Sequence, residues 1–233
     1  MMKNILLIGG SYGIGLALAK ELQYENKVFV ASRTNENLVD LHVTHIPFDT
    51  ATDTLDVSQL PELIDGLVYC PGSINLRPFK GLKPESFESD LQINFISLVK
   101  VIQTALPNLT ASSQSSIVLF SSVAASMGMP FHTSVAAAKG AIEGFAKALA
   151  AEYAPKIRVN VIAPSLTETP LADKFLNNDA KREKSAERHP LKRFGTPEDM
   201  AQMASFLLSE KSSWISGQIF HVDGGMSTLL VNG

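Results

Sequence analysis

Short apolar runs alternate with amphipathic stretches along almost the whole chain. Residues 5–8 read ILLI, glycines follow, and Ile14, Leu18 and Leu22 then recur at helical spacing. The runs are apolar throughout instead of at every second position, which is typical of strands buried on both faces. Alternating strands and helices therefore predict an α/β fold with a doubly wound parallel sheet. The other strands are expected at residues 28–31, 45–48, 66–70, 116–122, 158–164 and 218–222.

The length and composition allow one large domain. The chain has 233 residues, 45% of them apolar, and contains no internal repeat or low-complexity tract. We therefore predict a single domain over residues 1–233. Residues 165–196 mix charges, an Asn pair and prolines after a predicted strand end, a position that suits a mobile substrate lid.

Charge and cysteine content argue against several kinds of partner. The formal net charge of −3, without a block of like charges, is unlike that of proteins that bind nucleic acid or an anionic membrane. The single cysteine, Cys70, cannot form an internal disulfide or a zinc cage, and it suits a reducing compartment. Glycines from Gly9 onward interrupt the N-terminal apolar run, and no later run reaches about 18 residues. We expect a soluble, cytoplasmic protein without a metal.

The stretch GGSYGIG, residues 9–15, lies between the first predicted strand and its helix. Glycines there let the backbone approach a pyrophosphate, which then lies on the N–H groups and positive dipole of the helix start. A glycine-rich turn without a ligand is the alternative. The candidate cofactor-binding residues of this stretch are Gly9, Ser11, Tyr12, Gly13, Ile14 and Gly15.

The tetrapeptide ASRT, residues 31–34, ends the second predicted strand. In dinucleotide-binding folds an acid here binds the ribose 2′-hydroxyl, whereas an arginine nearby accommodates a 2′-phosphate. The chain offers Ser32 and Arg33 and no acid, which favours NADP(H); an ordinary surface arginine is the alternative. Asp49, at the next strand end, caps either the adenine pocket or only a turn.

Lys139 is the only charge in HTSVAAAKG, which opens a helix predicted to run through Tyr153. One turn earlier, on the same side of the helix, stands the apolar Val135. Lys139, Glu143 and Lys147 recur at every fourth residue, so a solvated stripe of ion pairs is one interpretation. The other is a lysine that serves a site.

Several separate motifs resemble, in order and spacing, those of the short-chain dehydrogenase/reductase family. They are GGSYGIG, Asn94 in LQINFISL, SSVAASMGMPFHTSVAAAK with Ser122 and Lys139, the turn IAPSLTET, and the ending RFGTPEDMAQMASFLLSEKSSWISGQIFHVDGG. More narrowly, the chain is similar to the reductases of beta-ketoacyl carrier thioesters, nearly from end to end. The resemblance implies a seven-stranded Rossmann sheet, a nicotinamide nucleotide cofactor and a homotetramer.

The resemblance also assigns site residues. Asn94, Ser122 and Lys139 take the places of the family's catalytic Asn, Ser and Lys, whereas Val135 takes the place of its tyrosine. In the family the tyrosine hydroxyl donates a proton as hydride reaches the carbonyl carbon, and the lysine charge makes that hydroxyl more acidic. Valine can do neither. Lys139 is implied to hold the nicotinamide ribose, and Thr169 the nicotinamide amide.

Two further departures affect the same pocket. The sequence YCPG, ending at Gly72, replaces the family's usual Asn-Asn-Ala-Gly after the fourth strand, although Gly72 keeps the turn. Cys70 in this loop is either a small buried residue or a reactive thiol. Pro164 and Ser165 replace the common Pro-Gly after the sixth strand, and Pro164 is kept as a candidate cofactor contact.

His132 is one candidate for the missing proton donor, since it lies three residues before the tyrosine's place. A loop residue without chemistry is the alternative interpretation. Ser134 is better placed as the helix N-cap. A water molecule held by Ser122, Asn94 and Lys139 is a further candidate, although water is a weak acid.

Two functions of different classes are consistent with these residues. The first is an NADP(H)-dependent oxidoreductase that transfers hydride to or from a small-molecule carbonyl or alcohol, with an altered proton relay. The second is an NADP(H)-binding sensor or partner subunit without dehydrogenase activity. The missing tyrosine favours the binder, whereas Ser122 favours the enzyme, because a pure binder has little use for it. An elimination that uses His132 and needs no hydride is a minor third hypothesis.

Overall fold

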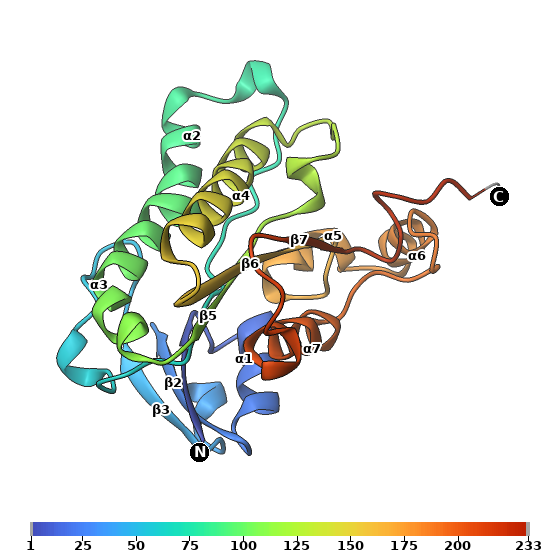
Figure 1. The fold of residues 1–233 in the computed structure, drawn as a ribbon. Coiled ribbons are helices and arrows are strands. Elements are labelled where there is room, and N and C mark those ends of the chain that lie inside the picture. Colours follow the sequence, from blue (N-terminus) through green and yellow to red (C-terminus); the bar gives the residue numbers. More distant parts are fainter. Residues whose placement is uncertain (1, 232–233) are drawn as a thin grey trace.

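The computed structural model describes residues 2–231, which form a seven-stranded parallel sheet in the order β3-β2-β1-β4-β5-β6-β7 (Figure 1). All the predicted strands are present, with ends that differ by a few residues, and the doubly wound fold class is confirmed. The strands are β1 (Lys3–Ile8), β2 (Asn26–Ser32), β3 (Val43–Pro47), β4 (Gly66–Tyr69), β5 (Ser115–Phe120), β6 (Ile157–Pro164) and β7 (Ile219–Val222).

Helices cover both faces of the sheet. α1 (Gly13–Leu22) and α7 (Pro197–Leu208) pack together on one face, and α3 (Ser97–Ala111) and α4 (Thr133–Tyr153) cover the other (Figure 1). Within the described residues, no helix has the length and apolar character needed to cross a bilayer. The shorter segments are α2 (Pro84–Leu91), α5 (Asp173–Leu176), α6 (Asp179–Glu187), a π-helical turn (Gln92–Ile96) and 3-10 turns at Glu36–Leu38, Val57–Gln59, Phe79–Gly81, Val123–Ala125, Pro170–Ala172 and Glu210–Ser212.

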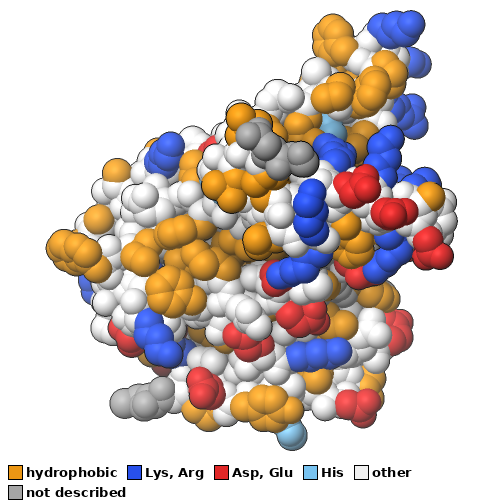
Figure 2. Space-filling model, turned by 90° about the vertical axis from the view of Figure 1, so that its right-hand side faces the viewer, with side chains coloured by type: hydrophobic (Ala, Val, Ile, Leu, Met, Phe, Trp, Pro, Cys, Tyr) orange, Lys and Arg blue, Asp and Glu red, His pale blue; other side chains and the backbone are white. Residues whose placement is uncertain are grey.

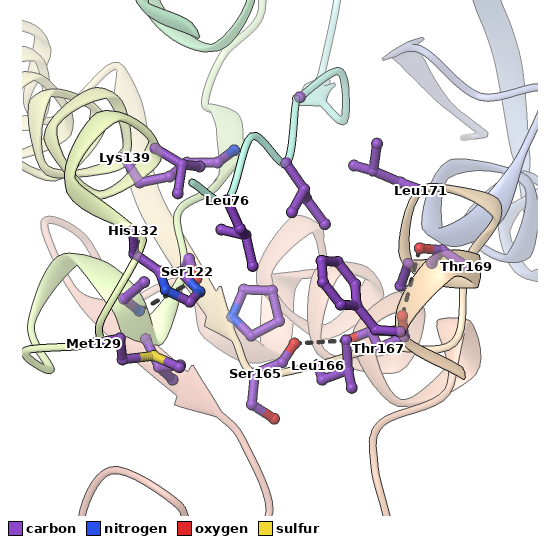
Figure 3. Close-up of a pocket in the computed structure, with 18 of the residues that line it drawn as sticks. Leu76, Ser122, Met129, His132, Lys139, Ser165, Leu166, Thr167, Thr169 and Leu171 are labelled. Carbon is purple, nitrogen blue, oxygen red and sulfur yellow. Dashed lines mark hydrogen bonds between the residues drawn. The ribbon is translucent and has the colours of Figure 1, made fainter. Parts of the chain in front are cut away.

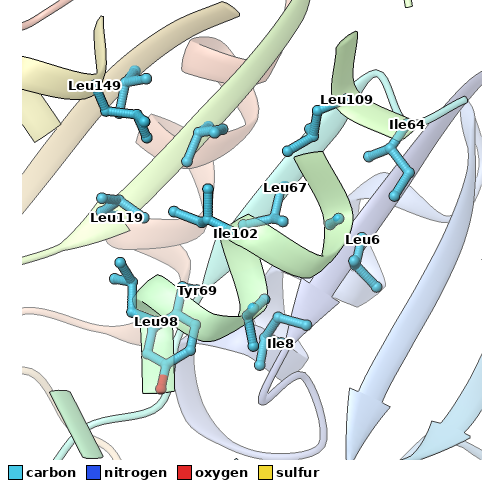
Figure 4. Close-up of a cluster of buried hydrophobic side chains, with 14 of the residues drawn as sticks. Leu6, Ile8, Ile64, Leu67, Tyr69, Leu98, Ile102, Leu109, Leu119 and Leu149 are labelled. Carbon is cyan, nitrogen blue, oxygen red and sulfur yellow. The ribbon is translucent and has the colours of Figure 1, made fainter. Parts of the chain in front are cut away.

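Two apolar cores lie on the two faces of the sheet. Successive side chains of a strand point to opposite faces, so Leu6 and Ile8 of β1 enter one core while Ile5 and Leu7 enter the other. Figure 4 shows Leu6 and Ile8 on the side covered by α3, whose Ile102 is also buried. Burial on both faces explains why the strand sequences are mostly apolar; β6 is an exception, with the buried Arg158 and Asn160.

The strand order reverses between β1 and β4: β2 and β3 are added on one side of β1, and β4 to β7 are added on the other. β1 pairs with β2 on one side and with β4 on the other, so the connections leaving β1 and β4 diverge and open a crevice at their carboxyl ends. The glycine stretch 9–15 follows β1 and residues 70–73 follow β4. Ser122 follows β5, and Ser165 follows β6. The fold therefore brings these four segments to one edge of the sheet.

Residues 165–196 form an ordered excursion beyond β6. α5 and α6 lie within it, and a parallel bridge joins Thr167 to Gly195 at its base. Arg182 of α6 forms an ion pair with Glu168. The position over the carboxyl ends of the strands suits a lid, and its mobility stays a prediction.

Candidate active site

A cavity of about 510 Å³ opens at the carboxyl ends of the central strands (Figure 3). Its wall includes residues from the glycine stretch, the loops after β4, β5 and β6, the start of α4, and the excursion 165–196. The predicted site residues that line it are Ile14, Gly72, Ser122, His132, Lys139, Pro164 and Thr169.

The glycine stretch is tightly folded at the start of α1. Gly9 and Gly13 have φ angles of +78° and +52°, in the left-handed region that favours glycine. A Cβ atom on Gly13 would lie 3.2 Å from Cγ2 of Thr169, and one on Gly15 would collide with the carbonyl oxygen of Gly9. Tyr12 precedes the helix without a side-chain capping bond, which leaves first-turn N–H groups for an anion.

A small hydrogen-bonded turn joins the end of β2 to the glycine stretch. The Ser32 hydroxyl donates to the carbonyl oxygen of Thr34 at 2.8 Å, and the Thr34 hydroxyl donates to that of Ser11 at 3.3 Å. The Asn37 side chain donates to the Ser11 carbonyl oxygen at 3.1 Å. Arg33 is exposed beside this turn. Its guanidinium is therefore accessible to an anion, whereas the Ser32 hydroxyl is already engaged in the turn.

Asp49 caps a turn, one of the two roles left open by the sequence. Its Oδ1 accepts from the backbone N–H of Ala51 at 2.9 Å, and its own N–H donates to Oδ2 of Asp53 at 2.7 Å. A contact between Asp49 and the adenine ring stays a prediction.

Lys139 is buried, with 8% of its surface exposed, and its ammonium donates to the carbonyl oxygen of Phe120 at 2.9 Å. Burial lowers the pKa of Lys139 to about 8, against the opposing influence of Cys70 and Asp90. Burial also raises the pKa of the Cys70 thiol to about 12, so this thiol is protonated at neutral pH.

The solvated-stripe interpretation of α4 is wrong for Lys139. Glu143, the next member of the stripe, is half-buried and accepts from the Ser121 hydroxyl at 2.6 Å. Of Lys139, Glu143 and Lys147, only Lys147 is exposed to solvent. These three charged residues recur at every fourth position, but the helix packs its first turns against the end of β5. The periodicity of the sequence alone does not reveal this packing.

Asn94 is fully buried in the π-helical turn that joins α2 to α3. Its side-chain amide donates to the Ser73 hydroxyl and to the Asp90 carbonyl oxygen, each at 2.8 Å. A Cβ atom on Gly72 would lie 3.1 Å from Oδ1 of Asn94 and 3.3 Å from Nζ of Lys139. Asn94 and Lys139 therefore lie close to the same backbone position, where a larger residue would be tightly packed.

Asp90 anchors the wall behind Asn94. This carboxylate is 3% exposed and accepts from the Ser73 hydroxyl at 2.5 Å and from the Ser134 hydroxyl at 2.6 Å. Ser134 is thus inside α4 and bonded across to α2, so the prediction that it is the N-cap is wrong. The N-cap is His132, without a side-chain capping bond.

Val135 is buried and lines the cavity together with Ser122 and Lys139. Figure 3 shows Ser122, His132 and Lys139 along one side of this cavity. Nδ1 of His132 lies 2.7 Å from the carbonyl oxygen of Pro130. Because a carbonyl oxygen only accepts, Nδ1 carries the hydrogen and Nε2 is left for another partner.

Tyr69, at the end of β4, does not replace the missing tyrosine. Tyr69 is buried in the core, donates to the carbonyl oxygen of Ile93 at 2.8 Å, and has a pKa raised by burial. Cys70 lines the cavity and is half-buried, and its raised pKa keeps the thiol neutral at neutral pH, which argues against the reactive-thiol interpretation.

A buried histidine of the cavity wall was not anticipated from the sequence. His189, 3% exposed, places Nδ1 2.8 Å from the carbonyl oxygen of Ser185 and Nε2 2.9 Å from the hydroxyl of Ser165. Ser165 stood out in the sequence as a departure from Pro-Gly. Its partner lies 24 residues later, and only the folded excursion brings the two together.

The cavity wall is largely apolar, and its charged side chains are all cationic. Among its described residues, five are Lys or Arg and none is Asp or Glu; the five are Lys139, Lys174, Lys181, Lys184 and Arg188. Figure 2, which shows the face carrying α6, displays Lys and Arg side chains interspersed with acidic ones on the molecular surface. In the described part of the chain, no cluster of three His, Cys, Asp or Glu residues is arranged to hold a metal. The wall therefore suits an anionic organic ligand.

Known proteins resemble this chain in sequence and fold. Residues 56–227 match the model of a family described as enoyl-(acyl carrier protein) reductase. A 3-oxoacyl-[acyl-carrier-protein] reductase from Thermotoga maritima is 31% identical over 96% of this chain and 97% of its own length. An inactive 2-(S)-hydroxypropyl-CoM dehydrogenase from Xanthobacter autotrophicus is 35% identical over 71% of this chain and 74% of its own.

A solved structure extends the likeness to three dimensions. The gluconate 5-dehydrogenase of Burkholderia cenocepacia, in complex with NADP and tartrate, superposes with a TM-score of 0.88 at 25% identity, over 98% of this chain and 96% of its own. The fold, the order of the motifs and the matched sequences agree. The chain therefore belongs to the short-chain dehydrogenase/reductase family of oxidoreductases.

Proposed function

We propose that the protein is an NADP(H)-dependent oxidoreductase that transfers hydride between nicotinamide and a small-molecule carbonyl or alcohol, with an atypical proton relay. The observation that carries this proposal is the convergence of Ser122, Lys139 and Thr169 on one cavity. A nucleotide-binding protein without chemistry would need the lysine and the threonine, but it would have little use for the serine hydroxyl.

The residues around the cavity fit a nicotinamide nucleotide. The glycine stretch leaves space at the start of α1 for a pyrophosphate. Gly72 leaves open the approach to the Lys139 ammonium, which would hold the nicotinamide ribose. Pro164 and Thr169 would border the nicotinamide. When bound, the nicotinamide supplies or accepts the hydride.

The protein side chains would orient the substrate and stabilise its charge. The Ser122 oxygen accepts from the backbone N–H of Ala124 at 3.2 Å, so its own hydrogen is available for a substrate oxygen. Lys139 would stabilise negative charge on that oxygen. Asn94 keeps the loop after β4 in place. Val135 has no proton to give, and His132, whose Nε2 is left for another partner, is one candidate donor.

The alternative is an NADP(H)-binding sensor or partner subunit. Val135 supports it, and so does the 35% identity to a dehydrogenase named as inactive. Titration with NADPH and NADH, followed by a turnover assay with a panel of carbonyl compounds on the same preparation, separates the two functions. Turnover supports the oxidoreductase, binding without turnover supports the alternative, and failure to bind either nucleotide contradicts both.

Arg33→Ala is expected to reduce the preference for NADPH over NADH. A charge-assisted hydrogen bond to the 2′-phosphate contributes about 1.5 to 3 kcal/mol, or roughly 10- to 150-fold in affinity. We expect the lower end, because Tyr12 occupies the place where many NADP-preferring relatives carry a second cation. Lys27→Ala, at the opposite end of β2, is the matched control. Equal affinities in the wild type, or an unchanged ratio in Arg33→Ala, would contradict the NADP(H) assignment.

We also expect a homotetramer, in which α4 packs against its copy. Ala137 and Ala148 are exposed on α4 and Ala141 is half-buried, so the helix presents a second apolar side. Phe145 contributes less, because it packs edge to face on Phe95. Light scattering at about micromolar concentration should give the mass of four chains, and Ala148→Glu should lower it. A monomeric wild type would refute this expectation.

A further inference from the structure

We propose that Ser165 and His189 form a proton relay that serves the cavity in place of the absent tyrosine hydroxyl. Ser165 would be the catalytic hydroxyl, and His189 the residue that positions it and exchanges its proton. The inference rests on the proposed hydride transfer, and it assigns a second pair of residues to that reaction, on a different segment of the wall from Ser122.

The hydrogen bonds of His189 define what the ring can do. Nδ1 faces the carbonyl oxygen of Ser185 at 2.8 Å, and this oxygen can only accept, so Nδ1 carries a hydrogen in every protonation state. Nε2 faces the Ser165 hydroxyl at 2.9 Å. A neutral ring therefore accepts from Ser165, and a protonated ring donates to it. Both forms keep every ring nitrogen hydrogen-bonded in a site that is 3% exposed.

The pair lies where a substrate oxygen can be reached. Ser165 directly follows β6 and lines the cavity that Ser122 and Lys139 also line. Figure 3 shows the Ser165 side chain at the edge of this cavity. His189 lines the cavity as well and lies just beyond the end of α6. A substrate bound between these walls would meet a hydroxyl whose proton is exchangeable with a buried imidazole.

The proton movements balance in both directions. In reduction, the carbonyl carbon gains the hydride and the Ser165 hydroxyl proton moves to the substrate oxygen. The Nε2 proton of the His189 imidazolium then moves to Ser165. The products are an alcohol and a neutral His189 ring. In oxidation, the alcohol carbon loses the hydride, its O–H proton moves to Ser165, and the Ser165 proton moves to Nε2. The imidazolium then donates to two oxygen atoms, those of Ser165 and Ser185.

His132 is the competing donor and is less firmly held. It is the half-buried N-cap residue of α4, and a single hydrogen bond, to the Pro130 carbonyl oxygen, orients its ring. Two bonds hold the ring of His189. A proton donor acts efficiently when its geometry is set before reaction, which favours the doubly held pair.

A purely structural role is the other competing explanation, since the same bond ties the excursion 165–196 to the end of β6. Ser165→Ala and His189→Gln distinguish the roles, because glutamine can bond to Ser165 but cannot carry the proton. Each change is made alone and together with Val135→Tyr. A second serine–histidine pair, Ser126 and His221 at 3.1 Å, does not line the cavity; Ser126→Ala and His221→Gln are the matched controls.

A relay predicts that Ser165→Ala and His189→Gln each lower kcat about 10²-fold or more, within the range for general acid–base catalysis, with NADPH affinity unchanged. Adding Val135→Tyr should restore turnover to the level of Val135→Tyr alone, since a phenol makes the relay dispensable. The controls should behave as wild type. Thermal unfolding verifies folding, and if His189→Gln does not fold, Ser165→Ala decides.

Unchanged turnover in Ser165→Ala, or a loss that Val135→Tyr does not restore, overturns the relay. A second result also overturns the relay: His132→Ala loses turnover to the extent expected for Ser165→Ala, while Ser165→Ala keeps wild-type turnover. His132 would then be the proton donor. A wild type that binds NADPH without turnover overturns the relay as well. In that case an active Val135→Tyr shows that the cavity can still support hydride transfer, whereas an inactive Val135→Tyr removes the proposed function as well.

Discussion

Val135→Tyr should raise the turnover of a carbonyl substrate toward the roughly 10²- to 10⁴-fold that a positioned general acid contributes, less the part that the present proton donor already supplies. Val135 lines the same cavity as the Ser122 hydroxyl and the Lys139 ammonium. A phenol at this position would stand beside a cation, which favours its ionised form and makes it a stronger acid. Steady-state assays with NADPH and the carbonyl panel measure the gain in kcat.

The fit of the larger ring sets the limit of this gain. Val135 is 5% exposed, and an added ring in a well-packed wall costs about 1 to 3 kcal/mol of stability. The adjoining cavity of about 510 Å³ gives the ring a direction in which to extend. Val135→Phe is the control, because it adds the same ring without the hydroxyl and should give no gain.

The comparison with His132→Ala identifies the present donor. If His132 supplies the proton, this variant loses turnover while NADPH still binds, and the double variant with Val135→Tyr regains it. If water or Ser165 supplies it, His132→Ala changes little. A folded Val135→Tyr that binds NADPH but remains inactive across the panel would lead us to abandon the oxidoreductase function.

The fold was predictable because burial leaves a direct signature in the sequence. Strands covered on both faces are mostly apolar, and the runs at 5–8, 66–70 and 116–122 coincide with the three central strands, β1, β4 and β5. The order of motifs along such a sheet then places Gly72 and Ser122 at the same edge. Their convergence on one cavity follows from topology, without knowledge of side-chain contacts.

Contacts made by loops and by buried polar groups were not predictable. The bond between Ser165 and His189 depends on how the excursion after β6 folds back, which has no periodic signal. Asp90 lies in an ordinary amphipathic helix by pattern, yet it accepts two hydroxyl hydrogen bonds across to Ser73 and Ser134. The burial of Lys139 was ambiguous for a related reason, because charges four residues apart are common on solvated helices.

Lys139→Met should stabilise the folded protein at pH 7 while weakening nucleotide binding. Burial lowers the pKa of this lysine from 10.5 to about 8, which corresponds to a penalty of about 3 kcal/mol for keeping the ammonium in the fold. Methionine removes that penalty but leaves the Phe120 carbonyl oxygen without its hydrogen bond, at a cost of about 1 kcal/mol or more. We expect a net gain of about 2 kcal/mol in the free energy of unfolding.

The pH dependence of this gain tests its cause. Between pH 8 and 10.5 the unfolded wild type binds the lysine proton more readily than the folded protein, so wild-type stability rises with pH relative to a variant without the group. The advantage of Lys139→Met should therefore be greatest below pH 8 and decline as pH rises toward 10.5. Urea denaturation at pH 7 and pH 10, with NADPH titration at pH 7, measures both effects.

Lys147→Met is the matched control on the same helix, since Lys147 is exposed. It should change stability by less than about 0.5 kcal/mol and keep the wild-type pH dependence and NADPH affinity. A Lys139→Met protein less stable than wild type at pH 7 would show that the lysine supports the fold. Stabilisation combined with lost binding would instead show that this helix retains a destabilising buried cation because the nucleotide site requires it, as expected where function and stability conflict.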